Sequence, residues 1–318
     1  MIDQPIKTFA ETWPLCGEAS QAIFTVTRPF VNPIVDETGL TQPRVVNILL
    51  VTRAIEPEAI TPERIWRRYP YGTLDSWARP MATLAERQLL VAQSDGSYRL
   101  TPGGRALITR LLKEFYAGLA GIEKSIEPEF STAEVERLAA LLNDIVAECF
   151  NASLDRSGLI DTHGLVPNGK AATTLARVDQ ALDDLNAFRD DAHLAAWRPL
   201  QVAGEAWELL TFLWRGEVKN ADEMVEKAGS RGHTQEAYQS ALGDLIGRGW
   251  VRAAGDAERR AFEVTAAGRQ VRDDAEAATD RFFYAPWQVL NETEVDDLRE
   301  LLTRLKAALA HTAEAAPA

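Results

Sequence analysis

The sequence has few cysteines and no long apolar run. Among its 318 residues are two cysteines, Cys16 and Cys149, which lie far apart and have no CxxC partner. This usage favours reduced thiols over a disulfide framework, and we expect Cys149 to pack on an apolar stripe rather than to sense oxidants. The longest apolar runs, such as residues 48–51, fall far below the ~18 residues that span a bilayer, and residues 1–24 show no basic stretch followed by an apolar core. We therefore predict a cytoplasmic protein with no membrane partner.

Positive charge is also scarce. Lys and Arg number 34 against 47 Asp and Glu, which gives a net charge of −13. This argues against non-specific coating of nucleic acid or of anionic membrane, because both attractions need positive charge. The deficit is uneven, since residues 44–110 carry ten basic and six acidic side chains, a net of +4, and subtracting this from −13 leaves −17 elsewhere. Local binding of nucleic acid by this basic stretch is therefore not excluded.

Signatures of catalysis and of cofactor binding are absent from the sequence. It contains no GxGxxG, P-loop, GxSxG or HExxH motif, and no cysteine and histidine pair at metal-binding spacing. The four histidines are scattered, and His193 follows Asp190 and Asp191. General acid/base work or metal binding is one interpretation of His193, and a helical surface residue paired with nearby acids is the simpler one. We predict that the protein is not an enzyme and has no cofactor and no metal site.

One pattern occurs twice, at a spacing near 161 residues. Residues 73–87 align with residues 234–248, so that Trp77 matches Tyr238. Each of these segments starts with a threonine cap, has an acid in its first turn and carries an apolar stripe at helical spacing. Farther on, the offset grows to 164, and both halves contain the motif Thr-x-x-Gly-Arg, at residues 101–105 and 265–269. The sequence therefore contains an internal repeat.

Each half is predicted to form helix, helix, capped helix, two-stranded hairpin, long helix and final helix. The hairpin turns are expected near residues 94–96 and 255–258, where glycine suits a tight turn. The fold class is therefore mainly α with short β-hairpins. The predicted organisation is a first half at residues 1–150, a glycine-containing linker at 151–174 and a second half at 175–318, with long flanking helices in each half.

The capped apolar helix, the short hairpin and the Thr-x-x-Gly-Arg motif together resemble winged helix-turn-helix proteins. The long flanking helices resemble the MarR-type branch of that superfamily. The second half, from residues 189–197 through 265–269 to 276–281, is similar to a largely uncharacterised family of actinobacterial helix-turn-helix proteins with two such halves. The resemblance implies DNA binding. MarR-type proteins usually act as homodimers with a ligand pocket between wing domain and dimer helices, so one chain with both halves is expected to form an intrachain pseudo-dimer.

The residues predicted to contact DNA lie around the two capped helices and the second hairpin. In the first half they are basic or hydroxyl side chains that can meet phosphate or a base edge, and in the second half they are mainly His, Gln and Arg. The predicted set is Arg67, Arg68, Thr73, Ser76 and Arg79 in the first half, and His233, Gln235, Gln239, Arg259 and Arg260 in the second. Acids such as Glu236 would meet phosphate unfavourably, so DNA binding is better supported for the first half.

Aromatic residues suggest a second kind of site. The chain has eight tryptophans, and aromatic rings could either fill the cores or line a pocket for a flat aromatic or apolar ligand. Residues 282–287 favour a pocket, because aromatic residues follow one another there irrespective of helical period. The predicted pocket residues are Phe115, Tyr116, Trp197, Phe282, Phe283, Tyr284 and Trp287.

Three functions follow from these observations. The leading prediction is a MarR-like transcriptional regulator that binds double-stranded DNA and has a small-molecule pocket between wing domains and long helices. The alternative is a protein that kept the scaffold, lost DNA binding and binds or sequesters a ligand. An enzyme built on the same pocket is the third. The chain is expected to be a monomeric pseudo-dimer or a homodimer.

Overall fold

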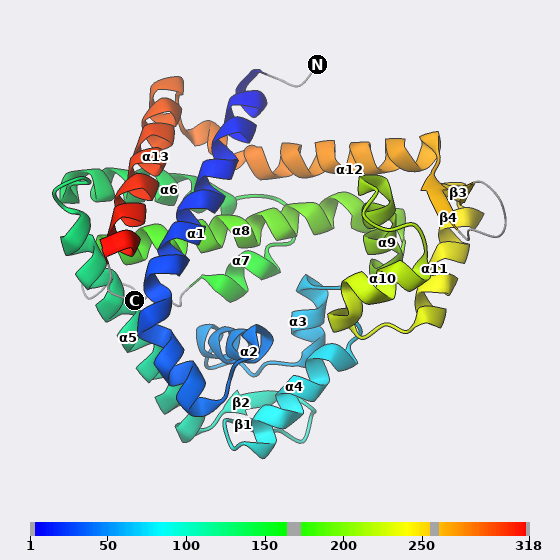
Figure 1. The fold of residues 1–318 in the computed structure, drawn as a ribbon, viewed down its shortest axis with the longest axis horizontal. Helices are drawn as coiled ribbons and strands as arrows, with labels where there is room; N and C mark the ends of the chain where they lie inside the picture. The colour runs from blue at the N-terminus through cyan, green and yellow to red at the C-terminus, as the bar shows by residue number, and fades with distance from the viewer. Residues whose placement is uncertain (1–3, 164–172, 255–260, 316–318) are drawn as a thin grey trace.

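The computed structural model describes residues 4–163, 173–254 and 261–315, and these ranges are mostly helical (Figure 1). Two short antiparallel hairpins are the sheets among the described residues. The predicted mainly α class with short hairpins is therefore confirmed. Both Cys16 and Cys149 are free thiols in buried positions. None of the described helices is long and apolar enough to cross a membrane.

Each half contains three short helices followed by a hairpin. In the first half these elements are α2 (Pro43–Ala54), α3 (Pro62–Arg68), α4 (Asp75–Glu86), β1 (Leu90–Ala92) and β2 (Tyr98–Leu100). In the second half they are α9 (Gly204–Arg215), α10 (Ala221–Ala228), α11 (Gln235–Gly247), β3 (Val251–Ala254) and β4 (Ala261–Val264). We call residues 43–100 the first segment and residues 204–264 the second segment.

The two hairpins are built alike. The first pairs Leu90 with Leu100, and the second pairs Val251 with Val264. In the first segment Ile60 adds a bridge to the hairpin, and its N–H donates to the carbonyl of Tyr98 at 2.9 Å. In the second segment the N–H of Phe262 donates to the carbonyl of Lys219 at 2.8 Å. Each hairpin is thus hydrogen-bonded to the loop that connects the first two helices of its segment.

Six long helices form a helical scaffold that carries both segments. They are α1 (Gln4–Thr38), α5 (Pro102–Ile126) and α6 (Thr132–Cys149) in the first half, and α8 (Thr174–Trp197), α12 (Ala266–Tyr284) and α13 (Glu292–Ala315) in the second. Helix α6 starts with a capping box of Ser131 and Glu134, and at α13 Asn291 and Glu294 exchange hydrogen bonds in the same way. The spacing of both residue pairs in the sequence is that of a capping box.

The scaffold helices pack across the two halves. Helix α1 lies along α13, and α8 lies along α6, so the first helix of each half packs on the last helix of the other (Figure 1). Their apolar stripes fill one core, which includes Ile23 of α1, Leu142 of α6 and Leu305 of α13 at 0% exposure. Each segment has its own smaller core. Neither half buries the stripes of its long helices without the other.

The stretch predicted as a linker contains a short helix, α7 (Ser157–Thr162), in its described part. Helix α7 packs on α8 and contacts α2 of the first segment. In Figure 1 it lies between α8 and the first segment, which occupies the lower part of the view, while the second segment lies at the right. Helix α7 therefore fixes the first segment against the scaffold.

The glycine of each Thr-x-x-Gly-Arg motif is required by a close backbone approach. A Cβ atom at Gly104 would lie 2.0 Å from the carbonyl oxygen of Leu89, and one at Gly268 would lie 2.1 Å from that of Trp250. The motif threonine caps the helix, since Thr101 Oγ1 accepts from the N–H of Gly104 at 2.9 Å and Thr265 Oγ1 from that of Gly268 at 3.1 Å. The repeated motif thus locks each hairpin to the long helix that follows.

Replacing Gly104 by Ala is expected to lower the free energy of unfolding by about 2 kcal/mol, because backbone must move to admit the methyl group. Gly103→Ala is the matched control: its Cβ would lie 3.6 Å from Thr101 Oγ1, an ordinary contact, and alanine favours the helix. Urea denaturation of both variants measures the difference. Equal stability of the two variants would contradict the close approach.

Candidate functional site

The helices predicted to read DNA, α4 and α11, start in the same way. Thr73 Oγ1 accepts from the N–H of Ser76 at 3.2 Å, and Thr234 Oγ1 accepts from the N–H of Ala237 at 3.2 Å. Trp77 and Tyr238 then anchor the helices, each buried in the core of its segment. Both helices therefore present their first turns at the surface of their own segment.

These two helix starts meet each other in the structure. The N–H of Thr73 donates to the carbonyl of Arg231 at 2.9 Å, and His233 Nε2 lies 3.0 Å from the carbonyl oxygen of Tyr71. Gly232 turns the chain at this point with a φ of 80°, and a Cβ there would lie 2.9 Å from Thr73 Oγ1. The turn before α4 thus packs directly on the turn before α11.

Further contacts extend this junction. A Cβ atom at Gly204, the first residue of α9, would lie 2.0 Å from the carbonyl oxygen of Pro70. The Arg198 guanidinium donates to the carbonyl of Arg67. We call the contact of residues 67–76 with residues 198–204 and 231–233 the inter-segment contact. Its closest approaches involve backbone, which leaves little room for adjustment.

An ion pair of low exposure holds the second side of the inter-segment contact. Arg231 Nη2 lies 2.9 Å from Glu208 Oε1, and the Glu208 side chain is 8% exposed. Burial raises the pKa of Glu208, and the Arg231 charge partly offsets the rise. The Arg231 guanidinium also lies 5.7 Å from the centre of the Tyr71 ring of the first segment. Arg231 therefore contacts the first segment through both its side chain and its backbone carbonyl.

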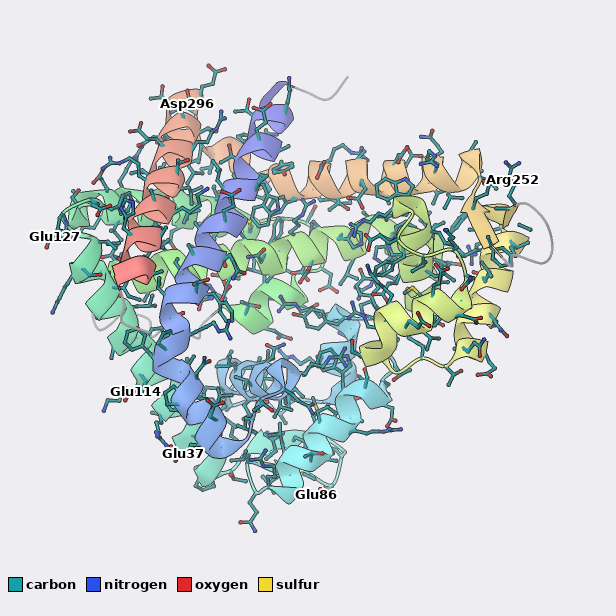
Figure 2. The ribbon with its side chains drawn as sticks, viewed as in Figure 1. Glu37, Glu86, Glu114, Glu127, Arg252 and Asp296 are labelled. Atoms are coloured by element: carbon teal, nitrogen blue, oxygen red, sulfur yellow. The ribbon has the colours of Figure 1, made fainter. Side chains whose placement is uncertain are left out.

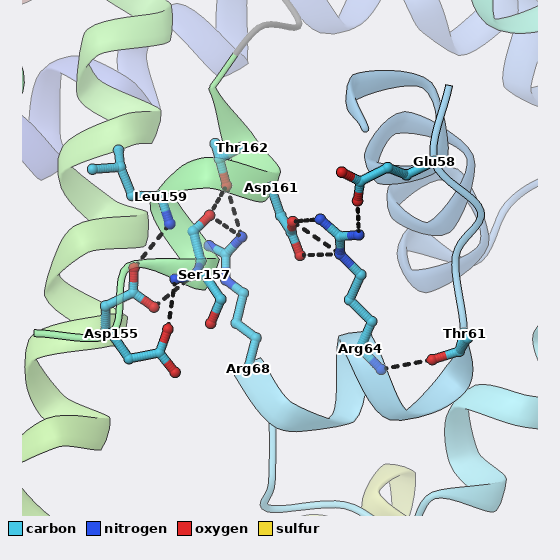
Figure 3. A network of polar contacts seen from close by, with 11 residues as sticks. Glu58, Thr61, Arg64, Arg68, Asp155, Ser157, Leu159, Asp161 and Thr162 are labelled. Carbon is cyan, nitrogen blue, oxygen red and sulfur yellow. Dashed lines mark hydrogen bonds and ion pairs between the residues drawn. The ribbon is translucent and has the colours of Figure 1, made fainter. Parts of the chain in front are cut away.

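Helix α3 is fastened to α7 by two arginines (Figure 3). Arg64 Nη2 lies 2.6 Å from Asp161 Oδ1, and Arg68 Nη1 donates to Thr162 Oγ1 at 2.7 Å. Arg68 also lies 3.4 Å from Asp190 Oδ2, and its side chain is 13% exposed. Arg68, which was predicted to contact DNA, is thus engaged within the protein.

Helix α7 is in turn capped by Asp191 of α8. The two carboxylate oxygens of Asp191 accept from the N–H groups of Gly158 and Leu159, each at 2.9 Å. Burial raises the pKa of Asp191 to about 6, and the two backbone N–H groups oppose the rise. One continuous network of polar contacts therefore links the first segment to α7 and α8.

The structure divides the residues predicted to contact DNA into two groups. Arg67, Arg79, Gln235 and Gln239 are exposed, with Arg79 exposing 81% of its side chain beside Asp75. Thr73, Ser76 and His233 lie at the inter-segment contact, and Arg68 lies in the α7 network. Arg259 and Arg260 fall outside the described residues. A surface ion pair such as Arg79 with Asp75 is weak, so it does not withhold Arg79 from phosphate.

Acidic side chains project from the outer rim of the molecule. In Figure 2, Glu37, Glu114 and Glu127 point outward along the left edge, and Glu86 and Asp296 do so at the bottom and top. Arg252, on β3, is a cation at the right edge and lies 2.7 Å from Glu263. Four of these five acids, all except Glu86, lie outside the basic stretch of residues 44–110.

The aromatic residues predicted to line one pocket are distributed over several surroundings. Phe283, Tyr284 and Trp287 are at most 2% exposed and pack on one another, with ring centres 4.9 to 5.7 Å apart. Phe115 and Tyr116 pack against the same scaffold core from α5. Trp197 stacks on Trp207 in the core of the second segment, and Phe282 is 39% exposed. The structure thus places three of these rings in the scaffold core and two more, Phe115 and Tyr116, against the same core.

A polar cavity between α8, α9 and α12 was not predicted from the sequence. His193 of α8 lies in its wall, and the N–H of Trp207 Nε1 donates to His193 Nε2 at 3.4 Å. His193 Nδ1 lies 3.4 Å from Thr279 Oγ1, whose hydroxyl donates to the carbonyl of Ala275. Because Nε2 accepts and Nδ1 faces an oxygen that donates elsewhere, the ring is neutral with its proton on Nδ1. The signal for this cavity in the sequence is the presence of polar residues on α12 at positions where the aligned residues of α5 are apolar.

Metal binding has no candidate among the described residues, since none of their His, Cys, Asp and Glu side chains form a group of three or more that could hold an ion. Burial raises the pKa of Cys16 to about 12, so this thiol stays protonated at neutral pH. Cys149 is also fully buried and its pKa is raised by burial. These thiols have the surroundings of packing residues rather than of nucleophiles.

Comparison with known proteins gives one match. A family model described as "Helix-turn-helix family" matches residues 120–317, which is more than half of the chain. The matched range includes the whole second segment and leaves the first segment outside. No curated protein and no solved structure matches the chain.

The pKa values of two histidines are expected to shift in opposite directions from the ordinary value of 6.5. Desolvation, with three nearby arginines, lowers the pKa of His193 to about 4, whereas the carboxylate of Asp184, 2.7 Å away, raises the pKa of His163. A folded-state pKa below the ordinary value means that His193 reduces the free energy of unfolding as pH falls from 6.5 towards 4. Nitrogen-detected NMR of the imidazole rings, assigned with His193→Gln, measures both values. Titration of His193 near 6.5 would contradict the described packing.

Proposed function

Because the chain belongs to this helix-turn-helix family, we propose that it is a MarR-like DNA-binding transcriptional regulator. Its two segments are winged helix-turn-helix units that form a pseudo-dimer within one chain. In each unit, α4 or α11 is the recognition helix and the hairpin that follows is the wing. The proposed division is a first half at residues 1–150, a linker at 151–174 and a second half at 175–318.

The observation that carries this proposal is the reciprocal packing of two copies of one element order. Helix α1 packs on α13 as α8 packs on α6, and each half then continues into three short helices, a hairpin and two long helices. In a symmetric dimer the same surface of each subunit meets its counterpart, and exchanged terminal helices give such an interface. The arrangement supports a chain that contains its own dimer partner.

The proposed contacts with DNA start from the exposed polar side chains of the recognition helices. Arg79 on α4 and Gln239 on α11 are exposed, and their side chains suit phosphate or guanine and adenine edges respectively. Arg67 and Gln235 are exposed near the same helix starts. Thr73, Ser76 and His233 join this surface only when the inter-segment contact opens.

The described arrangement is closed with respect to DNA. Successive major grooves on one face of B-DNA lie about 34 Å apart. A hydrogen bond of 2.9 Å from the N–H of Thr73 to the carbonyl of Arg231 joins the starts of α4 and α11. While this contact is made, the two helices cannot enter successive grooves at the same time. We propose that binding of both units requires the two segments to separate, with the scaffold as their common support.

The alternative function is a ligand-binding or sequestering protein on a winged-helix scaffold that no longer binds DNA. Engagement of Arg68, Thr73 and His233 inside the protein favours it, as does the net charge of −17 outside residues 44–110. The two functions differ in one measurable property, specific retention of DNA. Both are compatible with a ligand cavity beside the scaffold helices.

Specific DNA retention is expected to depend on Arg79. In mobility-shift titrations with genomic fragments, Arg79→Ala should weaken binding about tenfold and lower the salt slope by about 1, as expected for a lost phosphate contact. Arg281→Ala is the matched control, because Arg281 is also an exposed arginine but lies on α12 of the scaffold. Equal effects of the two variants, or no retained fragment at low salt, would favour the sequestering alternative.

Locking the inter-segment contact is expected to block DNA binding. A Cβ atom at Gly232 would lie 3.6 Å from Ser76 Cβ, within the roughly 3.5–4.5 Å of disulfides, so Ser76→Cys with Gly232→Cys gives a reducible staple. The oxidised double variant should bind specific fragments at least about tenfold more weakly than the same protein after reduction. Ser76→Ala with Gly232→Cys, oxidised, is the control, because it keeps the strain of a side chain at the positive φ of residue 232 but cannot form the disulfide. Undiminished binding by the stapled protein would show that the closed arrangement itself holds DNA.

A further inference from the structure

The polar cavity between α8, α9 and α12 has a volume of about 370 Å³. Its walls come from scaffold helices on two sides and from the first helix of the second segment on the third. They carry three arginines, two carboxylates and otherwise amide, hydroxyl and imidazole groups. The cavity thus joins the second segment to the scaffold through polar side chains.

The buried arginine in this wall lacks acceptors. Arg272 of α12 is 1% exposed, and its Nη2 lies 2.5 Å from Glu276 Oε1. No described residue accepts a hydrogen bond from its Nε or Nη1. The guanidinium lies 4.4 Å from the ring centre of Trp207 and 5.3 Å from that of Trp214, which attracts the cation but leaves those donors unsatisfied. A buried donor without an acceptor costs folding free energy. The Nε and Nη1 donors of Arg272 would therefore be stabilised by a bound acceptor that the described residues do not supply.

The two halves differ sharply at these positions. With the offset of 164 given by the two Thr-x-x-Gly-Arg motifs, Arg272 aligns with Ile108, Glu276 with Leu112 and Thr279 with Phe115. Ile108 is fully buried in the core of the first segment. One scaffold helix of the second half therefore carries three polar side chains where its counterpart carries apolar ones. Folding of this architecture does not require them, since the first half folds with apolar residues there.

Charge in the cavity is unbalanced. Arg272, Arg215 and Arg189 face two carboxylates, those of Glu276 and Asp190, which leaves one positive charge. Outside the wall, Arg68 lies 3.4 Å from Asp190, Asp280 lies 3.4 Å from Arg189, and Glu217 lies 3.9 Å from Arg215 and 2.8 Å from Lys227. The charges of these four outside groups cancel. His193 adds no charge, because its ring is neutral. An excess of a single positive charge favours a monoanion over a dianion such as phosphate.

We propose that this cavity binds a small polar organic monocarboxylate. The carboxylate provides the negative charge and the acceptors beside Arg272 and Arg215, and hydroxyl or amide substituents of the ligand meet Asn186 and Thr211. This ligand differs from the flat apolar one expected from the aromatic residues. The inference rests on the proposed function, since a bound anion would bridge α9 of the second segment, which carries the proposed recognition helix α11, to α8 and α12.

The test uses the full-length protein without DNA. Glycolate and lactate are titrated by calorimetry and by tryptophan fluorescence, because Trp207 and Trp214 lie against Arg272. Methyl glycolate, a neutral ester, and inorganic phosphate are the comparison probes. We expect saturable binding of at least one carboxylate, and at least about tenfold weaker binding of the ester and of phosphate.

Three variants separate ligand binding from stability. Arg272→Met should abolish carboxylate binding while keeping or raising the melting temperature, because an apolar side chain suits the equivalent position in the first half. Thr211→Val alters the neutral wall and should weaken binding while leaving the guanidinium groups intact. Arg281→Met, on the exposed face of the same helix, is the matched control and should change neither property.

Several results would overturn the proposal. They are equal binding by wild type and Arg272→Met, equal binding of acid and ester, stronger binding of phosphate, or no binding of either carboxylate to folded wild type. If Arg272→Met fails to fold, Thr211→Val together with the ester comparison decides the matter. Because DNA is absent from these measurements, failure here leaves the DNA-retention result standing, and failure of DNA retention leaves the carboxylate result standing.

Discussion

The exchange of terminal helices between the two halves is the interaction on which the rest of the structure depends. Helices α1 and α13, and likewise α8 and α6, bury each other's apolar stripes in a core shared by both halves. Burial of this kind is the dominant stabilising term in folding, and neither half has it alone. Both segments are carried on this scaffold, so their relative placement follows from the lengths and crossings of the six long helices.

That placement gives the protein a closed arrangement. The scaffold holds the segments close enough for the turns before α4 and α11 to share a backbone hydrogen bond, and Gly204 and Gly232 permit the approach. The α7 network fixes the first segment to α8, whereas the second segment meets α8 and α12 around a cavity with an unsatisfied arginine. The second segment is therefore the one whose seating on the scaffold a ligand can alter, which connects the proposed cavity to the proposed opening.

Much of the local structure could be predicted from the repeat. Caps such as Thr73 and Ser131, the hairpins and the Thr-x-x-Gly junctions depend on neighbouring residues, so spacing and residue type suffice. The engagement of Arg68 could not be predicted, because its partners Thr162 and Asp190 lie about a hundred residues away. Residues 282–287 looked like a pocket because their aromatic side chains ignore helical period, but α12 ends at Tyr284 and Trp287 turns back into the core. The burial of Arg272 could not be predicted, because a charged residue at a core position of a helix gives no periodic signal.

Separation of the recognition helices on DNA is the central claim, and a distance measurement tests it most directly. Spin labels at Thr83→Cys on α4 and Ser240→Cys on α11 occupy exposed positions, and the native thiols Cys16 and Cys149 are buried. We expect electron-spin distance measurements to give one short distance in the free protein and a longer one, with the helices about 34 Å apart, on a specific DNA fragment. A distance that stays short while the protein is fully bound to that fragment would contradict the claim.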